Sequence, residues 1–149
     1  MIHIRHSHSG DGDRVLEIWR DAVLATHDFL RDDDRVEIEK EVQGFLPHAP
    51  LLLAVDDSDK PLGFMLLDGS HMEALFIDPA HHGKGIGRAL VHHALTLSPS
   101  LTTDVNEQNA QAAAFYCHLG FIQTGRSETD GQGRAYPLLH LTFHPQGQR

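Results

Sequence analysis

The stretch Met72-Glu73-Ala74-Leu75-Phe76-Ile77-Asp78-Pro79-Ala80-His81-His82-Gly83-Lys84-Gly85-Ile86-Gly87-Arg88 decides the fold of this 149-residue chain. Residues 72–77 are predicted to form a strand, and Asp78-Pro79 ends it because proline cannot donate to a strand ladder. Glycines at alternate positions follow, and an apolar repeat at helical spacing then runs from Ile86 to Leu97. A strand, a glycine turn and a helix in this order predict the start of an α/β crossover.

The turn at residues 82–88 is suited to an oxygen-rich anion. The first amide groups of a helix have no partner within the helix and carry a partial positive charge. Glycines let the backbone approach a ligand with no side chain in the way. Lys84 and Arg88 add full positive charges beside these donors. The turn is therefore predicted to bind a pyrophosphate group.

The sequence of this turn matches other known glycine-rich motifs less well. The dinucleotide-binding fingerprint reads G-x-G-x-x-G and needs an acid about 20 residues further on. Here the spacing is G-x-G-x-G, and the next acid is Asp104, in a predicted strand. The phosphate-binding loop G-x-x-x-x-G-K-[ST] is absent from the sequence. On the glycines alone, a plain tight turn before a helix remains an equal alternative.

The rest of the chain predicts one domain, residues 1–149, of the α/β (α+β) class with a mixed sheet. The second expected helix carries Ile38, Val42 and Phe45 on one face. The two strand–helix–strand crossings in the second half are expected to pair their strands in parallel. Helices are expected at about residues 13–25, 32–45, 86–97 and 109–119, and strands at 2–5, 51–55, 62–67, 72–77, 101–105, 121–126 and 136–143.

A second motif follows the glycine turn and reads Asn109-Ala110-Gln111-Ala112-Ala113-Ala114-Phe115-Tyr116-Cys117-His118-Leu119-Gly120-Phe121. Together the two motifs resemble the GNAT superfamily of N-acetyltransferases. In that family the turn reads Arg/Gln-x-x-Gly-x-Gly/Ala, and the later helix reads Asn-x-x-Ala-x-x-Phe-Tyr-x-x-x-Gly-Phe. The helix pattern matches at every position, whereas the turn has His82 in place of Arg or Gln. The stretch from Trp19 to Leu30 is similar to the YjaB-like branch of small bacterial acetyltransferases.

The resemblance implies a mixed sheet of about seven strands flanked by four helices, with acetyl-CoA as cofactor and CoA as product. The strands at 72–77 and 101–105 would splay apart, and the pantetheine arm would lie in the opening. Backbone groups of Leu75 and Ile77 would bond the amides of that arm. The residues expected at the cofactor are Leu75, Phe76, Ile77, His82, Gly83, Lys84, Gly85, Ile86, Gly87, Arg88, Asn106, Asn109 and Tyr116.

Two residues are expected to carry the catalysis. Tyr116 matches the family's usual proton donor, and a phenol is protonated at neutral pH and can supply a proton to the leaving thiolate. Glu73 is the expected base, because relatives carry an acid on this strand that acts directly or through water. His71 and His27 are rivals for that role, since imidazole titrates near neutrality.

The acceptor side of the sequence is less specific. Thr26, His27, Phe29 and His71 are the candidate substrate residues, because the family builds its acceptor pocket partly from the first two helices. The acidic run between residues 28 and 41 fits a cationic amine, and it equally fits the solvated face of a surface helix. The acceptor is therefore expected to be a primary amine of a small molecule, a peptide or a protein.

The composition excludes several other classes. The net charge of −9 argues against a nucleic-acid partner, and no apolar run is long enough to span a membrane. A single cysteine, Cys117, excludes an internal disulfide and favours the cytoplasm. The thirteen histidines show no converging ligand set, so no metal is expected. The chain is expected to act as a monomer or a homodimer.

The sequence therefore predicts an acetyl-CoA-dependent N-acetyltransferase in which the amine attacks the thioester directly in a ternary complex. Two alternatives stay open at this point. One is an acyl-CoA-binding sensor that has the same fold and little or no activity. The other is a nucleotide-binding protein that uses the same glycine turn, although no base-reading or ribose-reading motif accompanies it.

Overall fold

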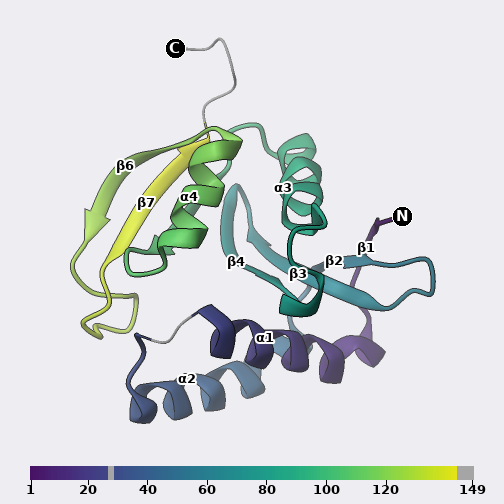
Figure 1. The fold of residues 1–149 in the computed structure, drawn as a ribbon, viewed down its shortest axis with the longest axis horizontal. Helices are drawn as coiled ribbons and strands as arrows, with labels where there is room; N and C mark the ends of the chain where they lie inside the picture. Colours follow the sequence, from purple (N-terminus) through teal and green to yellow (C-terminus); the bar gives the residue numbers. More distant parts are fainter. Residues whose placement is uncertain (27–28, 144–149) are drawn as a thin grey trace. The chain divides into compact units, whose positions relative to one another are not determined.

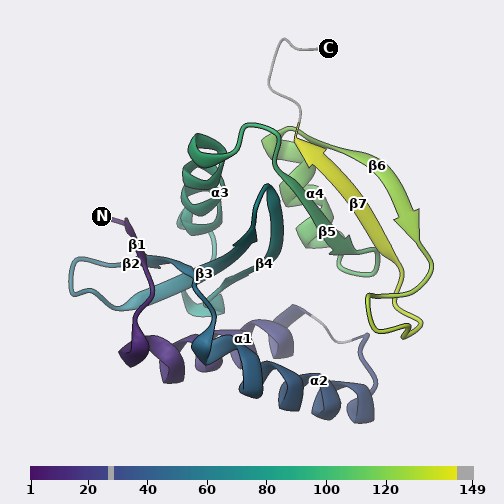
Figure 2. The ribbon, with the colours of Figure 1, turned by 180° about the vertical axis from the view of Figure 1, so that it is seen from behind.

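The computed structural model describes residues 1–26 and 29–143. Its strands form one mixed sheet in the order β1-β2-β3-β4-β5-β7-β6 (Figures 1 and 2). The elements are β1 (His3–His6), the short 3-10 helix η1 (Ser9–Asp11), α1 (Gly12–Thr26), α2 (Asp32–Phe45), η2 (Leu46–His48), β2 (Leu52–Val55), β3 (Pro61–Asp68), β4 (His71–Ile77), η3 (Pro79–His81), α3 (Ile86–Leu97), β5 (Thr102–Asn106), α4 (Ala110–Leu119), β6 (Phe121–Ser127) and β7 (Leu138–Phe143). The expected number and order of helices and strands are thus confirmed.

The chain divides into two compact units. The first comprises residues 1–67 and 74–93, and the second comprises residues 68–73 and 94–149. Strand β4 and helix α3 each contribute residues to both units. The expectation of a single domain stays a prediction.

The core of the first unit forms where α1 packs on the sheet. Val15, Ile18 and Trp19 recur at helical spacing, and all three are buried. They lie against Leu53 of β2 and Phe64 of β3, which are fully buried. Burying one such aliphatic or aromatic side chain contributes about 1.5–3 kcal/mol, so this cluster is the main source of stability in the unit.

Helix α2 lies beside α1 and is more exposed than its apolar pattern suggests (Figures 1 and 2). Ile38 and Val42 pack against the edge of the core as expected. Phe45, at the same helical spacing, is 55% exposed. Phe45 is the last residue of the helix, and the chain passes directly into η2, where Leu46 takes the buried position.

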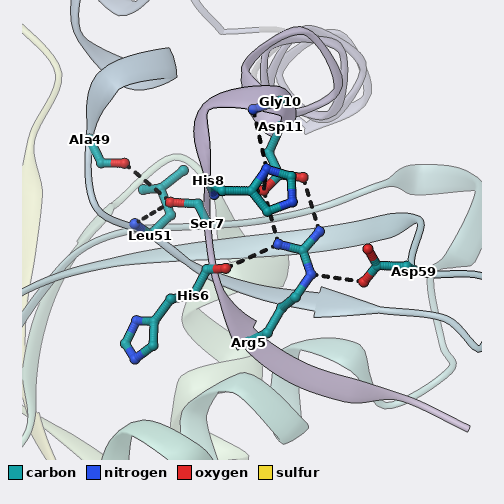
Figure 3. A network of polar contacts seen from close by, with 9 residues as sticks. All are labelled: Arg5, His6, Ser7, His8, Gly10, Asp11, Ala49, Leu51 and Asp59. Carbon is teal, nitrogen blue, oxygen red and sulfur yellow. Dashed lines mark hydrogen bonds and ion pairs between the residues drawn. The ribbon is translucent and has the colours of Figure 1, made fainter.

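A polar network joins the first strand to η1, the short helix that precedes α1 (Figure 3). Both terminal nitrogens of Arg5 donate to the carboxylate of Asp11, over 2.9 and 3.0 Å, and its Nε donates to Asp59 over 2.8 Å. Asp11 also accepts the backbone amide of His8. The Arg5 guanidinium holds the pKa of Asp11 below its ordinary value, so this buried carboxylate is charged and satisfied.

The second unit is built on antiparallel strands that one helix covers. Strand β7 pairs antiparallel with β5 and with β6, and α4 contacts β5 and β6 from one side of the sheet (Figures 1 and 2). Asn109 caps the start of α4 and Gly120 ends it with φ of 113°, both as expected.

One expected strand pairing was wrong. The crossing from β4 through α3 to β5 gives the expected parallel pair. The crossing from β5 through α4 to β6 does not, because β7 lies between β5 and β6. Strand β6 is mostly exposed and carries Gln123 and Arg126, which suits an edge strand, whereas the leucines of β7 suit an interior position.

Within the described ranges, no helix combines the length and the apolar character that a membrane span requires.

Candidate active site

The glycine turn adopts the backbone conformation that its sequence predicts. Gly83 and Gly85 have φ of 82° and 78°, in the left-handed region that other residues rarely adopt. The turn then passes into α3, and the carbonyl of Gly85 accepts the first helical hydrogen bond from the amide of Ala89. The amides of Ile86, Gly87 and Arg88 therefore have no partner within the helix. The turn presents backbone donors as an anion site requires.

The side chains of the turn divide into exposed and buried sets. His82, Lys84 and Arg88 are exposed, and Lys84 Nζ lies 3.0 Å from His81 Nδ1. Ile86 is buried and anchors the first turn of α3. These exposed side chains all belong to the turn or to the first turn of α3.

A buried ion pair holds the segment that leads into this turn. Arg14 Nη2 of α1 donates to Asp78 Oδ2 over 2.6 Å, and Arg14 Nε donates to the carbonyl of Pro61. Asp78 also accepts the amide of Ala80 and so caps η3. Burial raises the pKa of Asp78, but the hydrogen bonds from Arg14 and Ala80 outweigh burial and hold this pKa below its ordinary value.

Neither member of this pair was predicted as a site residue from the sequence. Arg14 lies four residues before Ile18, on the apolar face of an amphipathic helix. A charged residue in that position signals a buried partner, because an isolated buried charge is costly. The pattern could not identify Asp78 as that partner, since 64 residues separate the two.

The end of β4 packs closely against β3 and the start of α3. A Cβ atom added to Gly63 would lie 2.8 Å from Ile77 Cδ1 and 3.0 Å from Ile86 Cγ2. Phe76 stacks on Phe64 with ring centroids 5.6 Å apart. The side chains of Phe76, Ile77 and Ile86 thus serve the core, and any bond from Phe76 or Ile77 to a cofactor would come from the backbone.

The parallel ladder between β4 and β5 is short. It comprises His71↔Thr102 and Met72↔Thr103, while β4 continues to Ile77 and β5 continues to Asn106. This pair matches the two splayed strands that the resemblance implied.

Tyr116 is held at the apolar face of the second unit. Its side chain is buried, and its ring makes edge contacts with Phe115 and Phe121. Burial raises the pKa of Tyr116, so the phenol is protonated throughout the neutral range. Its hydroxyl lies near Thr103, whose own hydroxyl donates to the carbonyl of Met72 over 3.0 Å.

Two asparagines shape the turn between β5 and α4. Asn109 Oδ1 accepts the amide of Ala112, and the carbonyl of Asn106 accepts the amide of Asn109. Asn106 Oδ1 also accepts the amide of Gln108. Because their oxygens are used within the protein, each side chain would approach a ligand with its NH2 group.

The two base candidates on β4 have different surroundings. Glu73 is exposed and has no hydrogen bond or ion pair with any described residue. His71 is half-buried and contacts Thr102 and Asp104 of the neighbouring strand. His71 could be named as a candidate from the sequence but Asp104 could not, because a cross-strand neighbour depends on a register that the sequence does not show.

The substrate candidates of the first unit are described in part. Thr26 ends α1, and its hydroxyl donates to the carbonyl of Ala22 over 2.7 Å. Phe29 is half-buried. His27 lies outside the described residues. Among the described side chains, no three histidine, cysteine or acidic groups are placed to hold a metal ion.

Comparison with known proteins identifies a family. Residues 33–137 match the model of the acetyltransferase (GNAT) domain. The chain is 58% identical over 143 residues to peptidyl-lysine N-acetyltransferase YjaB of Salmonella typhimurium, covering 96% of this chain and 99% of that protein. It is 54% identical to the Escherichia coli protein of the same name, covering 96% and 97%. The solution structure of apo-form YjaB from Escherichia coli superposes with a TM-score of 0.93 at 55% identity, over 96% of this chain and 97% of that one.

Proposed function

The chain belongs to the GNAT acetyltransferase family, and from that premise we propose that it acetylates the side-chain amine of lysine in a peptide or protein. It is an acetyl-CoA-dependent N-acetyltransferase. The lysine acceptor is supported by relatives that are more than half identical over nearly their whole length. The same proposal places the reaction in the cytoplasm, in agreement with the single cysteine.

The glycine turn would hold the diphosphate of acetyl-CoA. The positive φ values of Gly83 and Gly85 carry this assignment, because they shape a turn that ends in unpaired helix amides. A Cβ atom at either glycine would meet nothing within 4 Å, so the space beside both is open to a ligand. Lys84 and Arg88 would add charge, and Leu75, Phe76 and Ile77 would offer backbone groups to the pantetheine arm.

Asn106, Asn109 and Tyr116 would meet the thioester end of the donor. The asparagine NH2 groups can donate to a carbonyl of the arm. Tyr116 would give its proton to the leaving thiolate, because a phenol is protonated at neutral pH.

The amine would attack the thioester directly, without an acyl-enzyme. Cys117 is adjacent to Tyr116 but exposed, whereas Tyr116 is buried, so the two side chains lie on different faces of α4. For the base, two residues of β4 remain candidates from the sequence, Glu73 and His71.

The proposed acceptor can be tested with a peptide that has a blocked N-terminus and one lysine. We expect CoA release and a mass increase of one acetyl group, and no reaction when arginine replaces the lysine. Polyamines, amino acids and aminoglycosides form the rest of the panel. Reaction with one of these and not with the peptide would reject the lysine proposal. Tight acetyl-CoA binding without any product would instead indicate the sensor.

The proposed donor site can be tested with charge variants. Lys84→Met and Arg88→Met should raise the KM for acetyl-CoA several-fold each, because each loses a charge-assisted contact to phosphate. Lys60→Met removes an exposed lysine from the β2–β3 turn and is the matched control. Calorimetry with ATP should show weaker binding than with acetyl-CoA. Tighter binding of ATP would contradict the assignment of the turn.

A further inference from the structure

A chain of polar side chains crosses four strands of the second unit. His71 of β4 places Nδ1 2.7 Å from Thr102 Oγ1 and Nε2 3.4 Å from Asp104 Oδ2 of β5. Asp104 Oδ1 lies 2.6 Å from Nδ1 of His140, on β7. His140 Nε2 in turn lies 2.6 Å from Ser127 Oγ, on β6.

These groups share one face of the sheet, and Tyr116 belongs to the other. The register pairs His71 with Thr102 and Asp104 with His140, and paired residues project to the same side. Thr103, which lies near the Tyr116 hydroxyl, stands between Thr102 and Asp104 in β5 and therefore projects to the opposite side. The proton donor and the polar chain thus approach the short β4–β5 ladder from opposite faces.

The hydrogen positions follow from the chemistry of the groups. An ionised carboxylate can only accept, so His140 Nδ1 carries the hydrogen that Asp104 accepts. The Nε2 atom of the neutral ring must then accept, and Ser127 donates to it. The chain from Ser127 through His140 therefore holds Asp104 by Oδ1 and leaves Oδ2 turned toward His71.

The contact between His71 and Asp104 leaves the lone pair of His71 Nε2 available to accept a proton. At 3.4 Å it is long for a hydrogen bond to a carboxylate, which is normally 2.7–2.9 Å. The short Nδ1 contact with Thr102 can take the hydrogen of the neutral ring, which leaves the lone pair on Nε2. The two side chains are 30% and 36% exposed, so an ammonium group can reach both.

We propose that His71 and Asp104 bind the acceptor ammonium together and that His71 Nε2 removes its first proton. This assignment rests on the proposed acetylation of an amine and adds its base. The neutral amine then forms its N–C bond as the C–S bond breaks, and Tyr116 protonates the sulfur. The second amine proton restores Tyr116. One proton thus leaves with CoA, and the other leaves through His71 to solvent.

The exposed carboxylate of Glu73, two residues along β4, is the competing base. No described residue holds the Glu73 side chain, whereas His71 contacts Thr102 and Asp104. A base positioned by neighbours loses less conformational freedom when it meets substrate. The ionisable groups near His71 in this unit are Asp104, His140 and Glu73, and the test substitutes Asp104 and Glu73 directly.

A glycine of β6 leaves space for the His140 ring in this series of polar side chains. Gly125 of β6 is the cross-strand partner of His140, and a Cβ atom there would lie 3.2 Å from His140 Cδ2. The imidazole therefore lies over a position that only glycine leaves free. Gly125→Ala is expected to displace His140 and so to act on Asp104 without touching His71.

The test measures kcat/KM for the lysine peptide against pH in four variants with intact acetyl-CoA binding. His71→Gln should lower kcat/KM about 100-fold at neutral pH. Its activity should then keep rising with pH, because only amine that is already neutral reacts. Asp104→Asn should raise the peptide KM about ten-fold and keep the wild-type profile shape. Glu73→Gln and His92→Gln, an exposed histidine of α3, should each change kcat/KM less than three-fold (about 0.6 kcal/mol).

The outcomes distinguish failure of the proposed lysine acceptor from failure of the proposed role of His71. Wild-type protein that does not acetylate the peptide would reject the lysine acceptor itself. Active wild-type protein with an unchanged profile in His71→Gln would overturn the role of His71 alone. If Glu73→Gln instead abolished the fall in kcat/KM at low pH, the base would be Glu73. That result would also overturn the proposed role of His71. Rescue of a His71→Gly variant by added imidazole would support a proton-transfer role, because a purely structural histidine is not replaced by free imidazole.

Discussion

The glycine turn of the first unit and the polar sheet face of the second present functional groups by different means. At the turn, the donors are backbone amides, and one buried ion pair, Arg14–Asp78, holds the approach to them. On the sheet face, the groups are side chains from β4, β5, β7 and β6 that hold one another. A local sequence pattern specifies the first kind of site. Long-range strand register specifies the second, so it has no short motif.

The largest expected effect concerns the ion pair that holds the turn. Arg14→Met leaves the carboxylate of Asp78 buried without its guanidinium, and breaking a buried pair costs roughly 3–5 kcal/mol in the free energy of unfolding. Urea denaturation measures the loss. Arg20→Met, on the same helix, breaks an exposed pair with Glu39 and should cost less than about 1 kcal/mol. Equal losses in the two variants would show that the Arg14 pair is not structurally special.

The pH dependence of the same variant sharpens this prediction. The pKa of Asp78 is lowered on folding, so its ionised form contributes stability above the ordinary carboxyl pKa of about 3.9. That contribution is lost as the pH falls through the lower folded value. The stability difference between wild type and Arg14→Met should therefore be largest at neutral pH and shrink in acid. A constant difference in urea denaturation from neutral pH into acid would contradict the assignment.

A smaller effect is expected at the glycine turn itself. Gly85→Ala meets no steric obstacle, but its φ of 78° costs a residue with a side chain about 1–2 kcal/mol. The backbone should relax and displace the amide donors, which raises the Kd for acetyl-CoA roughly ten-fold by calorimetry. Gly44→Ala in α2 is the control, and it should leave the Kd unchanged while stabilising the helix by about 0.5–1 kcal/mol. An unchanged Kd in Gly85→Ala would separate the turn from cofactor binding.

Much of the fold could be predicted because local sequence patterns, such as apolar spacing and helix caps, indicate its elements. The apolar spacing of Val15, Ile18 and Trp19 places α1, and Asn109 and Gly120 mark the two ends of α4. The exposure of Phe45 could not be predicted, because periodicity gives the face of a residue and not where its helix ends against the core.

The order of the last strands could not be predicted from the crossings alone. Both strands of the final hairpin were correctly placed in the sequence, but the hairpin folds back so that β7 pairs with β5. The polar character of β6 was the available signal, since Gln123 and Arg126 suit an edge.

The candidate site divides in the same way. Lys84, Gly85 and Tyr116 follow from motifs, and their roles remain proposals. Two other sets of contacts join residues that are far apart in the sequence, namely Arg14–Asp78 and Asp104–His140–Ser127. Local sequence patterns do not predict contacts of this kind. Such pairs become visible only with the strand register and the helix packing in hand.

The most direct test of the account is the Tyr116→Phe variant, measured with acetyl-CoA and the single-lysine peptide under conditions in which chemistry limits turnover. The variant should bind acetyl-CoA with an unchanged Kd, because the aromatic contacts with Phe115 and Phe121 remain. Its kcat should fall by roughly ten-fold or more, since the leaving thiolate loses its proton donor. An unchanged kcat would contradict the account, because the buried phenol would then have no part in acetyl transfer.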